Sequence, residues 1–103
     1  MMEFGIYQLK DDFLRELGFK SLPGGVKEVD LKKYNRVYIG QIKIADSAES
    51  ALDKLFTIFN IDHPVDFTGR SLSVSDVVLL GGQYYYCCTR GWKVVQVKKE
   101  GVA

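Results

Sequence analysis

The chain has 103 residues, 47% of them hydrophobic and 26% charged, which are ordinary values for one soluble globular domain. Its 14 basic and 13 acidic residues leave a formal net charge of +1, unlike the strongly basic domains that grip a phosphate backbone. No apolar run approaches the roughly 18 residues of a membrane span, and the first residues lack the features of a secretion signal, so we expect a cytoplasmic protein with no membrane partner.

The first elements predicted are a strand and a short helix. Apolar residues within residues 4–9 fall on both faces of a strand. Asp11 or Asp12 can cap a helix whose apolar side comes from residues 13–17. Gly18 stands where a left-handed C-terminal cap is expected. The N-terminal part of the chain therefore reads as one strand-helix unit.

Residues 20–35 predict a basic loop. The Pro23-Gly24-Gly25 run cannot sit inside a regular element, and lysines dominate the residues around it. Such a charge run is usually a solvated loop, although binding residues also concentrate on loops of this kind. The candidate contact residues in this segment are Lys27, Lys32, Lys33 and Tyr34.

A second strand and the clearest helix follow. Residues 37–44 predict an inner strand that is partly apolar on both faces, and Asp46 with Glu49 forms a capping-box-like start for a helix over 46–60. Apolar residues at helical spacing form one stripe that is expected to face the core: Ala48, Ala51, Leu52, Leu55, Phe56 and Phe59. Phe56→Ala is therefore expected to cost about 3–5 kcal/mol and to unfold much of the protein.

The chain carries little that suggests catalysis. The single histidine, His63, lies beside Pro64 in a predicted turn, with no neighbouring Ser or Cys that would form a nucleophile and base pair. Adjacent Cys87 and Cys88 point to opposite faces of a strand, which indicates buried thiols instead of a disulfide. We therefore expect a protein that is not an enzyme, with no catalytic residue, metal or cofactor. A small hydrolase around Asp62 and His63 is the weaker alternative.

The C-terminal half predicts an antiparallel platform. Its three strands are expected at 77–80, 83–89 and 92–98, joined by tight turns at Gly81-Gly82 and Arg90-Gly91. Three consecutive tyrosines in the middle strand place large rings on both faces. The fold class expected for residues 1–103 is a single α+β domain, a mostly antiparallel sheet of about five strands with two helices packed on one face.

The densest polar cluster precedes this platform and contains Arg70, Ser71, Ser73, Ser75 and Asp76. As a functional site, Arg70 would anchor an anion or carboxylate with hydroxyl groups beside it. As a structural feature, Asp76 and the serines would satisfy backbone groups of a turn. The sequence favours the structural interpretation and leaves the functional one open.

Several residues of this half carry a resemblance to a known family. They are Asn60, Pro64, Phe67, the run from Gly69 to Val78, Tyr85-Tyr86-Cys87 and Gly91-Trp92, together with Ile6-Tyr7-Gln8-Leu9 near the start. With these residues the chain resembles the YodL-like domain family. The resemblance implies an accessory protein of conjugative and other mobile elements of Firmicutes, and it carries no established catalytic motif.

The resemblance and the small size of the chain imply an anti-defence role. We expect a non-catalytic protein that inhibits a CRISPR-Cas9 effector, or its guide RNA assembly, by stoichiometric binding. The alternative is a nucleic-acid-binding accessory protein that contacts RNA or single-stranded DNA. A monomer and a homodimer through an exposed sheet edge both fit the sequence. The candidate partner-binding residues are Lys27, Lys32, Lys33, Tyr34, Arg70, Tyr84, Tyr85, Arg90 and Trp92.

Overall fold

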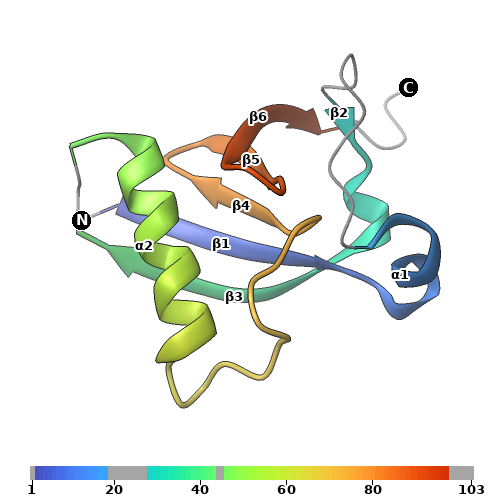
Figure 1. Cartoon of the computed structure of the whole chain (residues 1–103), viewed down its shortest axis with the longest axis horizontal. Coiled ribbons are helices and arrows are strands. Elements are labelled where there is room, and N and C mark those ends of the chain that lie inside the picture. Colours follow the sequence, from blue (N-terminus) through green and yellow to red (C-terminus); the bar gives the residue numbers. More distant parts are fainter. Residues whose placement is uncertain (1, 19–27, 44–45, 98–103) are drawn as a thin grey trace.

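One sheet of six strands organises the part of the chain that the computed structural model describes, residues 2–18, 28–43 and 46–97. The strands are β1 (Met2–Leu9), β2 (Glu28–Val29), β3 (Tyr34–Ile42), β4 (Val77–Leu80), β5 (Gln83–Cys87) and β6 (Trp92–Val97). They lie in the order β2-β6-β5-β4-β1-β3 (Figure 1), and every neighbouring pair is antiparallel except β2 with β6. The helices are α1 (Asp11–Leu17), α2 (Ala48–Ile61) and the short 3-10 helix η1 (Leu31–Lys33).

The predicted α+β class is confirmed, with six strands where about five were expected. The additional strand is β2, whose two residues show no strand periodicity and pair in parallel with the end of β6. Part of the segment predicted as a basic loop is therefore regular, because β2 and η1 lie within it and β3 begins at Tyr34. Residues 19–27 lie outside the described residues, and the predicted contact residue Lys27 falls among them.

The three-stranded platform of the C-terminal half is confirmed. β4, β5 and β6 lie side by side, and Tyr84 of β5 sits between Leu79 of β4 and Val95 of β6. The turn between β4 and β5 has Gly81 at φ +58° and Gly82 at φ +84°, a region that residues with a side chain rarely adopt. These two glycines therefore set the tight connection that aligns the tyrosine-rich strand with its neighbours.

β1 joins this platform to the rest of the sheet. It lies between β4 and the edge strand β3, where Ile6 is opposite Tyr38 and Tyr7 is opposite Arg36. That change of register means that β3 carries one additional residue, which is a β-bulge. Because of the bulge, Tyr38 lies on the face that α2 covers, whereas Tyr34 lies on the opposite face.

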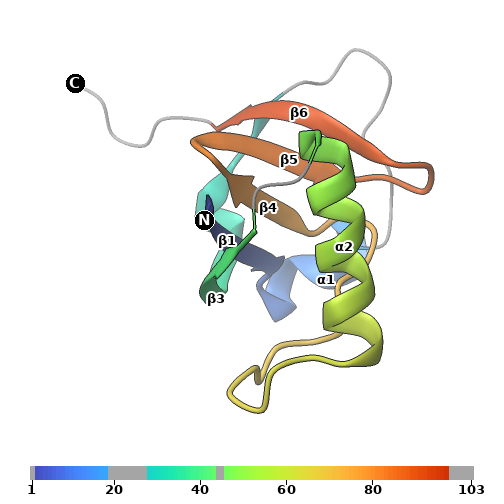
Figure 2. The same ribbon diagram turned by 90° about the vertical axis from the view of Figure 1, so that its left-hand side faces the viewer.

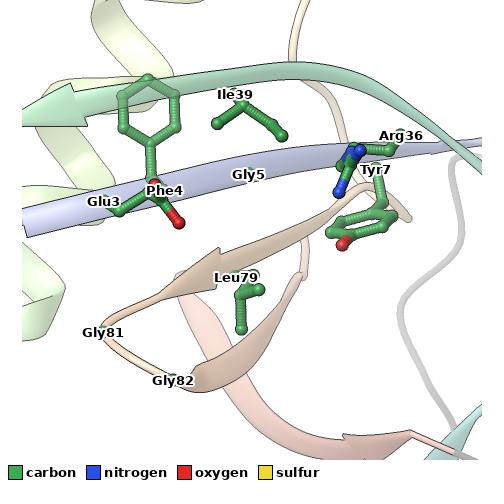
Figure 3. Close-up of a pocket in the computed structure, with 9 residues that line it drawn as sticks. All are labelled: Glu3, Phe4, Gly5, Tyr7, Arg36, Ile39, Leu79, Gly81 and Gly82. Carbon is green, nitrogen blue, oxygen red and sulfur yellow. The ribbon is translucent and has the colours of Figure 1, made fainter.

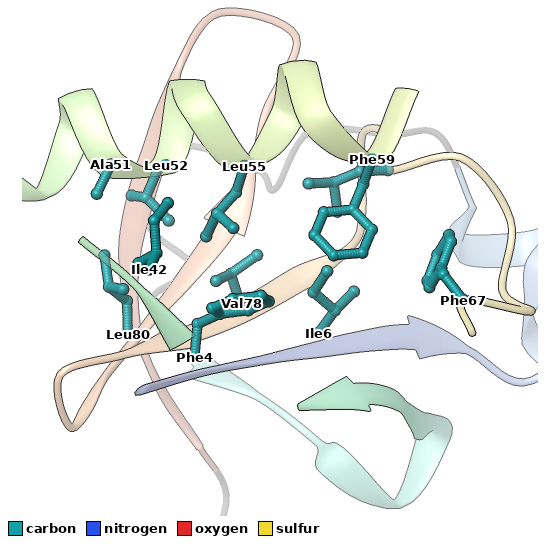
Figure 4. Close-up of a cluster of buried hydrophobic side chains, with 11 residues drawn as sticks. Phe4, Ile6, Ile42, Ala51, Leu52, Leu55, Phe59, Phe67, Val78 and Leu80 are labelled. Carbon is teal, nitrogen blue, oxygen red and sulfur yellow. The ribbon is translucent and has the colours of Figure 1, made fainter. Parts of the chain in front are cut away.

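The larger core cluster fills the space between α2 and the sheet (Figure 4). Three strands and the helix contribute to it, because alternate residues of each strand point toward α2. Its buried members are Phe4, Ile6, Ile42, Ala51, Leu52, Leu55, Phe59, Phe67, Leu72, Val78 and Leu80. Burial of each larger side chain contributes roughly 1.5–3 kcal/mol, so this cluster is the main source of stability.

The second core cluster lies on the opposite face of the sheet. Its buried members are Leu9, Val29, Tyr34, Val77, Tyr86 and Val95, and α1 packs against it through Phe13 and Leu14. The prediction that both helices pack on one face is therefore wrong. The alternation of β1 explains the outcome, because Ile6 points toward α2 while Leu9, at the end of the strand, points toward α1.

Phe56 does not belong to the core of α2. Its side chain is 39% exposed and its ring meets the edge of Trp92 at a centroid distance of 6.5 Å, whereas Phe59 is 1% exposed. The predicted cap of this helix is also wrong, since Ser47, not Asp46, accepts the hydrogen bond from the Ser50 N–H. The error at Phe56 arises because helical spacing alone does not fix where the sheet ends beneath a helix, whereas the cap error is a shift of one residue at the start of the helix.

The ends of α1 also differ from the prediction. Lys10 occupies the N-terminal cap position, and its side chain forms no capping hydrogen bond. Asp11 and Asp12 lie in the first turn, where their negative charge interacts favourably with the helix dipole. Gly18 is extended, with φ −68°, so it is not a left-handed cap. A Cβ at Gly18 would lie 2.5 Å from the Leu14 carbonyl oxygen, which makes close approach the reason for glycine.

Candidate binding surface

The residues of the predicted contact loop do not gather into one patch. Lys32 is exposed, while the Lys33 ammonium lies 5.5 Å from the centre of the Phe13 ring. Tyr34 is buried, and its hydroxyl donates a hydrogen bond of 2.9 Å to a backbone carbonyl of residue 75. Burial removes Tyr34 from the surface, so its ring cannot stack on a partner in this conformation.

Arg70 and Asp76 belong to a buried polar network that also includes Gln8, which was not predicted as a site residue. The Gln8 side chain donates to the Arg70 carbonyl at 2.8 Å and to Asp76 Oδ2 at 3.0 Å, and it accepts from the Arg70 N–H at 2.9 Å. Asp76 Oδ2 also accepts from the Ser73 N–H at 2.9 Å, and the Arg70 guanidinium donates to the Leu9 carbonyl at 3.0 Å. The network ties β1 to the segment before β4.

Asp76 is fully buried, with 0% of its surface exposed. Burial raises the pKa of Asp76 to about 6, although hydrogen bonds from Ser73 and Gln8 and the charge of Arg70 act in the opposite direction. Two atoms of the network, Arg70 Nη1 and Asp76 Oδ1, are buried without a hydrogen-bond partner among the described residues. Burial of the Asp76 carboxyl group supports the structural interpretation of this cluster, because the group does not face solvent.

The aromatic residues predicted as contacts are divided between the two faces of the sheet. Tyr85 and Trp92 pack partly against the cluster beneath α2, and Arg90 is exposed in the turn before β6. Tyr84 lies on the opposite face, next to Tyr7 at a ring centroid distance of 6.0 Å. No single flat partner can therefore contact all of the predicted aromatic residues at once.

The face with Tyr84 contains a hollow of about 150 Å³ over β1, shown in Figure 3. Gly5 forms its floor because it has no side chain, and Tyr7, Arg36, Ile39 and Leu79 project around it. No side chain of α1 or α2 lines this hollow. We call this surface the open face, and its residues are Glu3, Gly5, Tyr7, Arg36, Ile39, Leu79 and Tyr84.

The open face combines apolar, aromatic and charged groups. Ile39 is 48% exposed, and Glu3 and Arg36 are exposed at opposite ends of the hollow (Figure 3). Burial, and then the neighbouring Tyr7, raises the pKa of Tyr84, so its hydroxyl stays protonated and able to donate a hydrogen bond. Only Tyr84 of this surface was predicted. The other residues could not be predicted from the sequence, because the bulge and the position of β3 in the sheet are set by tertiary structure.

In residues 2–18, 28–43 and 46–97, no group of three or more His, Cys, Asp or Glu side chains is placed to hold a metal ion. His63 is exposed, with Nδ1 3.0 Å from the Pro64 carbonyl oxygen, and Cys87 and Cys88 are free thiols. Across the same residues, no helix combines the length and the apolar character needed to cross a bilayer.

A family model described as YodL-like domain matches residues 3–97. The match includes the polar network, the open face and nearly all of the six strands. No protein with a curated description and no solved structure matches the chain.

Proposed function

The chain belongs to the YodL-like domain family, and from that premise we propose that it is a non-catalytic binding protein of a mobile genetic element. It acts by surface contact with another protein. The observation that supports this proposal is the open face, a hollowed part of the sheet that neither described helix lines.

The composition of the open face suits a protein partner. Tyrosine and arginine dominate the residues that contribute most to protein interfaces, and this surface offers Tyr7, Tyr84 and Arg36 around a half-exposed Ile39. The missing side chain at Gly5 leaves room for an inserted side chain of the partner. Tyrosine side chains have few rotatable bonds, so they lose little conformational freedom on binding, which favours affinity.

The target that we propose is a CRISPR-Cas9 effector, alone or assembled with its guide RNA, inhibited by stoichiometric binding. The support for this narrower step is the accessory role that the family resemblance implies. A stoichiometric inhibitor needs a rigid surface and no turnover chemistry, and the open face lies on strands of a packed sheet.

The test uses purified chain and guide-loaded Cas9. We expect the effector to co-purify with the immobilised chain, and target cleavage to fall once the chain reaches equimolar concentration. Ile39→Asp should weaken binding at least tenfold. Val94→Asp is the matched control, because Val94 is equally exposed, at 50%, on the opposite face of the sheet.

The absence of a complex, with cleavage unchanged at molar excess, would remove Cas9 as the target. If Ile39→Asp and Val94→Asp reduce binding equally, the open face is not the contact surface. Binding to naked guide RNA that weakens steeply with salt would favour the nucleic-acid alternative instead.

A further inference from the structure

β3 is an edge strand with one side open. It pairs only with β1, so alternate residues direct their backbone N–H and C=O groups away from the sheet. Among the described residues, no backbone hydrogen bond joins this outer side of β3 to another segment. An extended strand is the structure that satisfies such a row of donors and acceptors.

Only the first half of β3 carries the features that usually protect a sheet edge. The bulge and the exposed Arg36 lie there, and both discourage pairing with a further strand. Residues 38–42 contain no charge, no proline and no bulge. The second half is therefore a regular edge on which another strand can be added.

Both faces next to this half of β3 are hollowed. On the α2 side, a groove of about 170 Å³ lies between β3 and the helix, and it is lined by Tyr38, Gly40, Gln41, Ile58 and Pro64 among others. On the opposite side lies the open face with Ile39 (Figure 3). The side chains of an added strand alternate between the two faces, so they would find space on both.

The glycine at position 40 leaves the groove floor without a side chain. A Cβ there would lie 2.9 Å from the Phe4 ring, and Phe4 in turn packs under Phe59 at a centroid distance of 5.9 Å. Figure 4 shows Phe4 among the core side chains beneath α2. The groove floor is consequently backbone and aromatic carbon, which suits an apolar side chain of the added strand.

Charge argues against a second copy of the chain as the added strand. Exposed Arg36 and Lys43 stand on either side of residues 38–42, and β3 itself contains no acidic residue. Two copies related by a two-fold axis pair antiparallel, and directly opposite residues point to the same face, so the register is centred on a residue such as Gly40. With the additional residue of the bulge counted, that register sets Arg36 opposite Lys43 of the partner copy. Like charges opposite each other destabilise a strand pair.

Two acidic residues close to this edge, Glu3 and Asp66, do not lie on its outer side. Glu3 lies one strand further in, opposite Gln41, and the Asp66 carboxylate accepts a hydrogen bond of 3.1 Å from the Tyr38 hydroxyl. A partner strand that brings its own carboxylates toward Arg36 and Lys43 meets complementary charge at both ends.

We propose that β3 receives an extended segment of a partner protein as an added edge strand, with apolar residues at its centre and acidic residues toward its ends. This inference rests on the proposed function, a protein-binding role, and names the kind of partner segment recognised. The backbone of β3 supplies the hydrogen bonds, the groove beside α2 takes an apolar side chain, and Arg36 and Lys43 select acidic flanks.

A displayed library of random decapeptides, selected on the folded chain, tests the proposal. We expect enriched peptides with alternating apolar residues and Asp or Glu near the ends. Their synthetic forms should bind at least tenfold more weakly to the double variant Arg36→Glu/Lys43→Glu. The control Arg15→Glu/Lys93→Glu makes the same charge change on α1 and β6, away from β3, and should bind as the wild type does. Bound peptide should slow hydrogen exchange of amides within residues 38–42.

Three outcomes overturn the proposal: no enrichment, equal binding to both double variants, or slowed exchange confined to other elements. Sedimentation of the free chain as a dimer that dissociates in Ile39→Asp would assign the edge to a second copy and also overturn it. The result is separable from the Cas9 test. If a bound peptide slows hydrogen exchange in β3 but the chain does not bind Cas9, only the proposal of Cas9 as the target is rejected. If Arg36→Glu/Lys43→Glu still binds Cas9, only the proposal of an added edge strand is rejected.

Discussion

The side-chain amide of Gln8 donates a hydrogen bond of 3.0 Å to Oδ2 of Asp76, across 68 positions of the chain. Through it, β1 is attached to the residues that enter β4, the strand beside it. The run from Gly69 to Val78, which carries much of the family resemblance, therefore has a structural role that is visible in atomic contacts.

We predict that Gln8→Leu destabilises the fold by about 2–4 kcal/mol, because Asp76 and the backbone of Arg70 lose partners while they remain buried. Urea denaturation followed by circular dichroism measures the change. Gln96→Leu is the control, since Gln96 is exposed on β6 and should shift stability by less than about 0.5 kcal/mol. Equal effects of the two variants would show that the network does not support the fold.

The raised pKa of Asp76 predicts an unusual pH dependence. Between pH 4 and pH 6 the native carboxyl holds a proton that the unfolded chain has released, so this group makes stability fall as pH rises through that range. The shift of the Asp76 pKa from 3.8 to about 6 corresponds to a decrease of up to about 3 kcal/mol in the free energy of unfolding. Below pH 4 the loss disappears.

Asp76→Asn isolates this contribution, because the amide does not titrate. We expect the free energy of unfolding of the wild type, relative to Asp76→Asn, to decrease between pH 4 and pH 6.5. Denaturant titrations of both proteins across that range measure the difference. A difference that stays constant, or that increases with pH, would mean that Asp76 is ionised at low pH in the native state.

The two phenylalanines of α2 should respond differently to truncation. Phe59→Ala removes a ring that is 1% exposed and meets Phe4, Tyr38 and Phe67, so we expect a cost of about 3–5 kcal/mol. Phe56→Ala removes a 39% exposed ring and should cost about 1 kcal/mol. Thermal melts compare them, and a larger loss for Phe56→Ala would contradict the observed packing.

The adjacent thiols should differ in reactivity. Burial is the main cause that raises the pKa of Cys87 to about 12, so its thiolate is scarce near neutral pH. Cys88 lies on the opposite face and is half-buried. We predict that iodoacetamide at pH 8 leaves Cys87 unmodified in the folded Cys88→Ser variant and modifies it in denaturant. Mass spectrometry reads the labelling, and rapid modification of native Cys87 would refute the prediction.

The sequence was sufficient for the features that depend on local chemistry. The glycines at 81 and 82 allow positive φ, and the residues on each side are mainly aliphatic or aromatic, so the platform of β4, β5 and β6 could be predicted. The buried stripe of Ala51, Leu52, Leu55 and Phe59 followed in the same way from helical spacing. Family membership also followed from residue identities alone, most of them between Phe67 and Trp92.

Other features required the tertiary structure, because they depend on pairs of residues far apart in the chain. Insertion of β1 between β4 and β3 creates the Gln8–Asp76 contact and leaves β3 at the edge. The bulge places Tyr34 and Tyr38 on opposite faces, although their spacing alone would place them on the same one. Strand order and register arise from the packing of the whole sheet, and no local pattern encodes them.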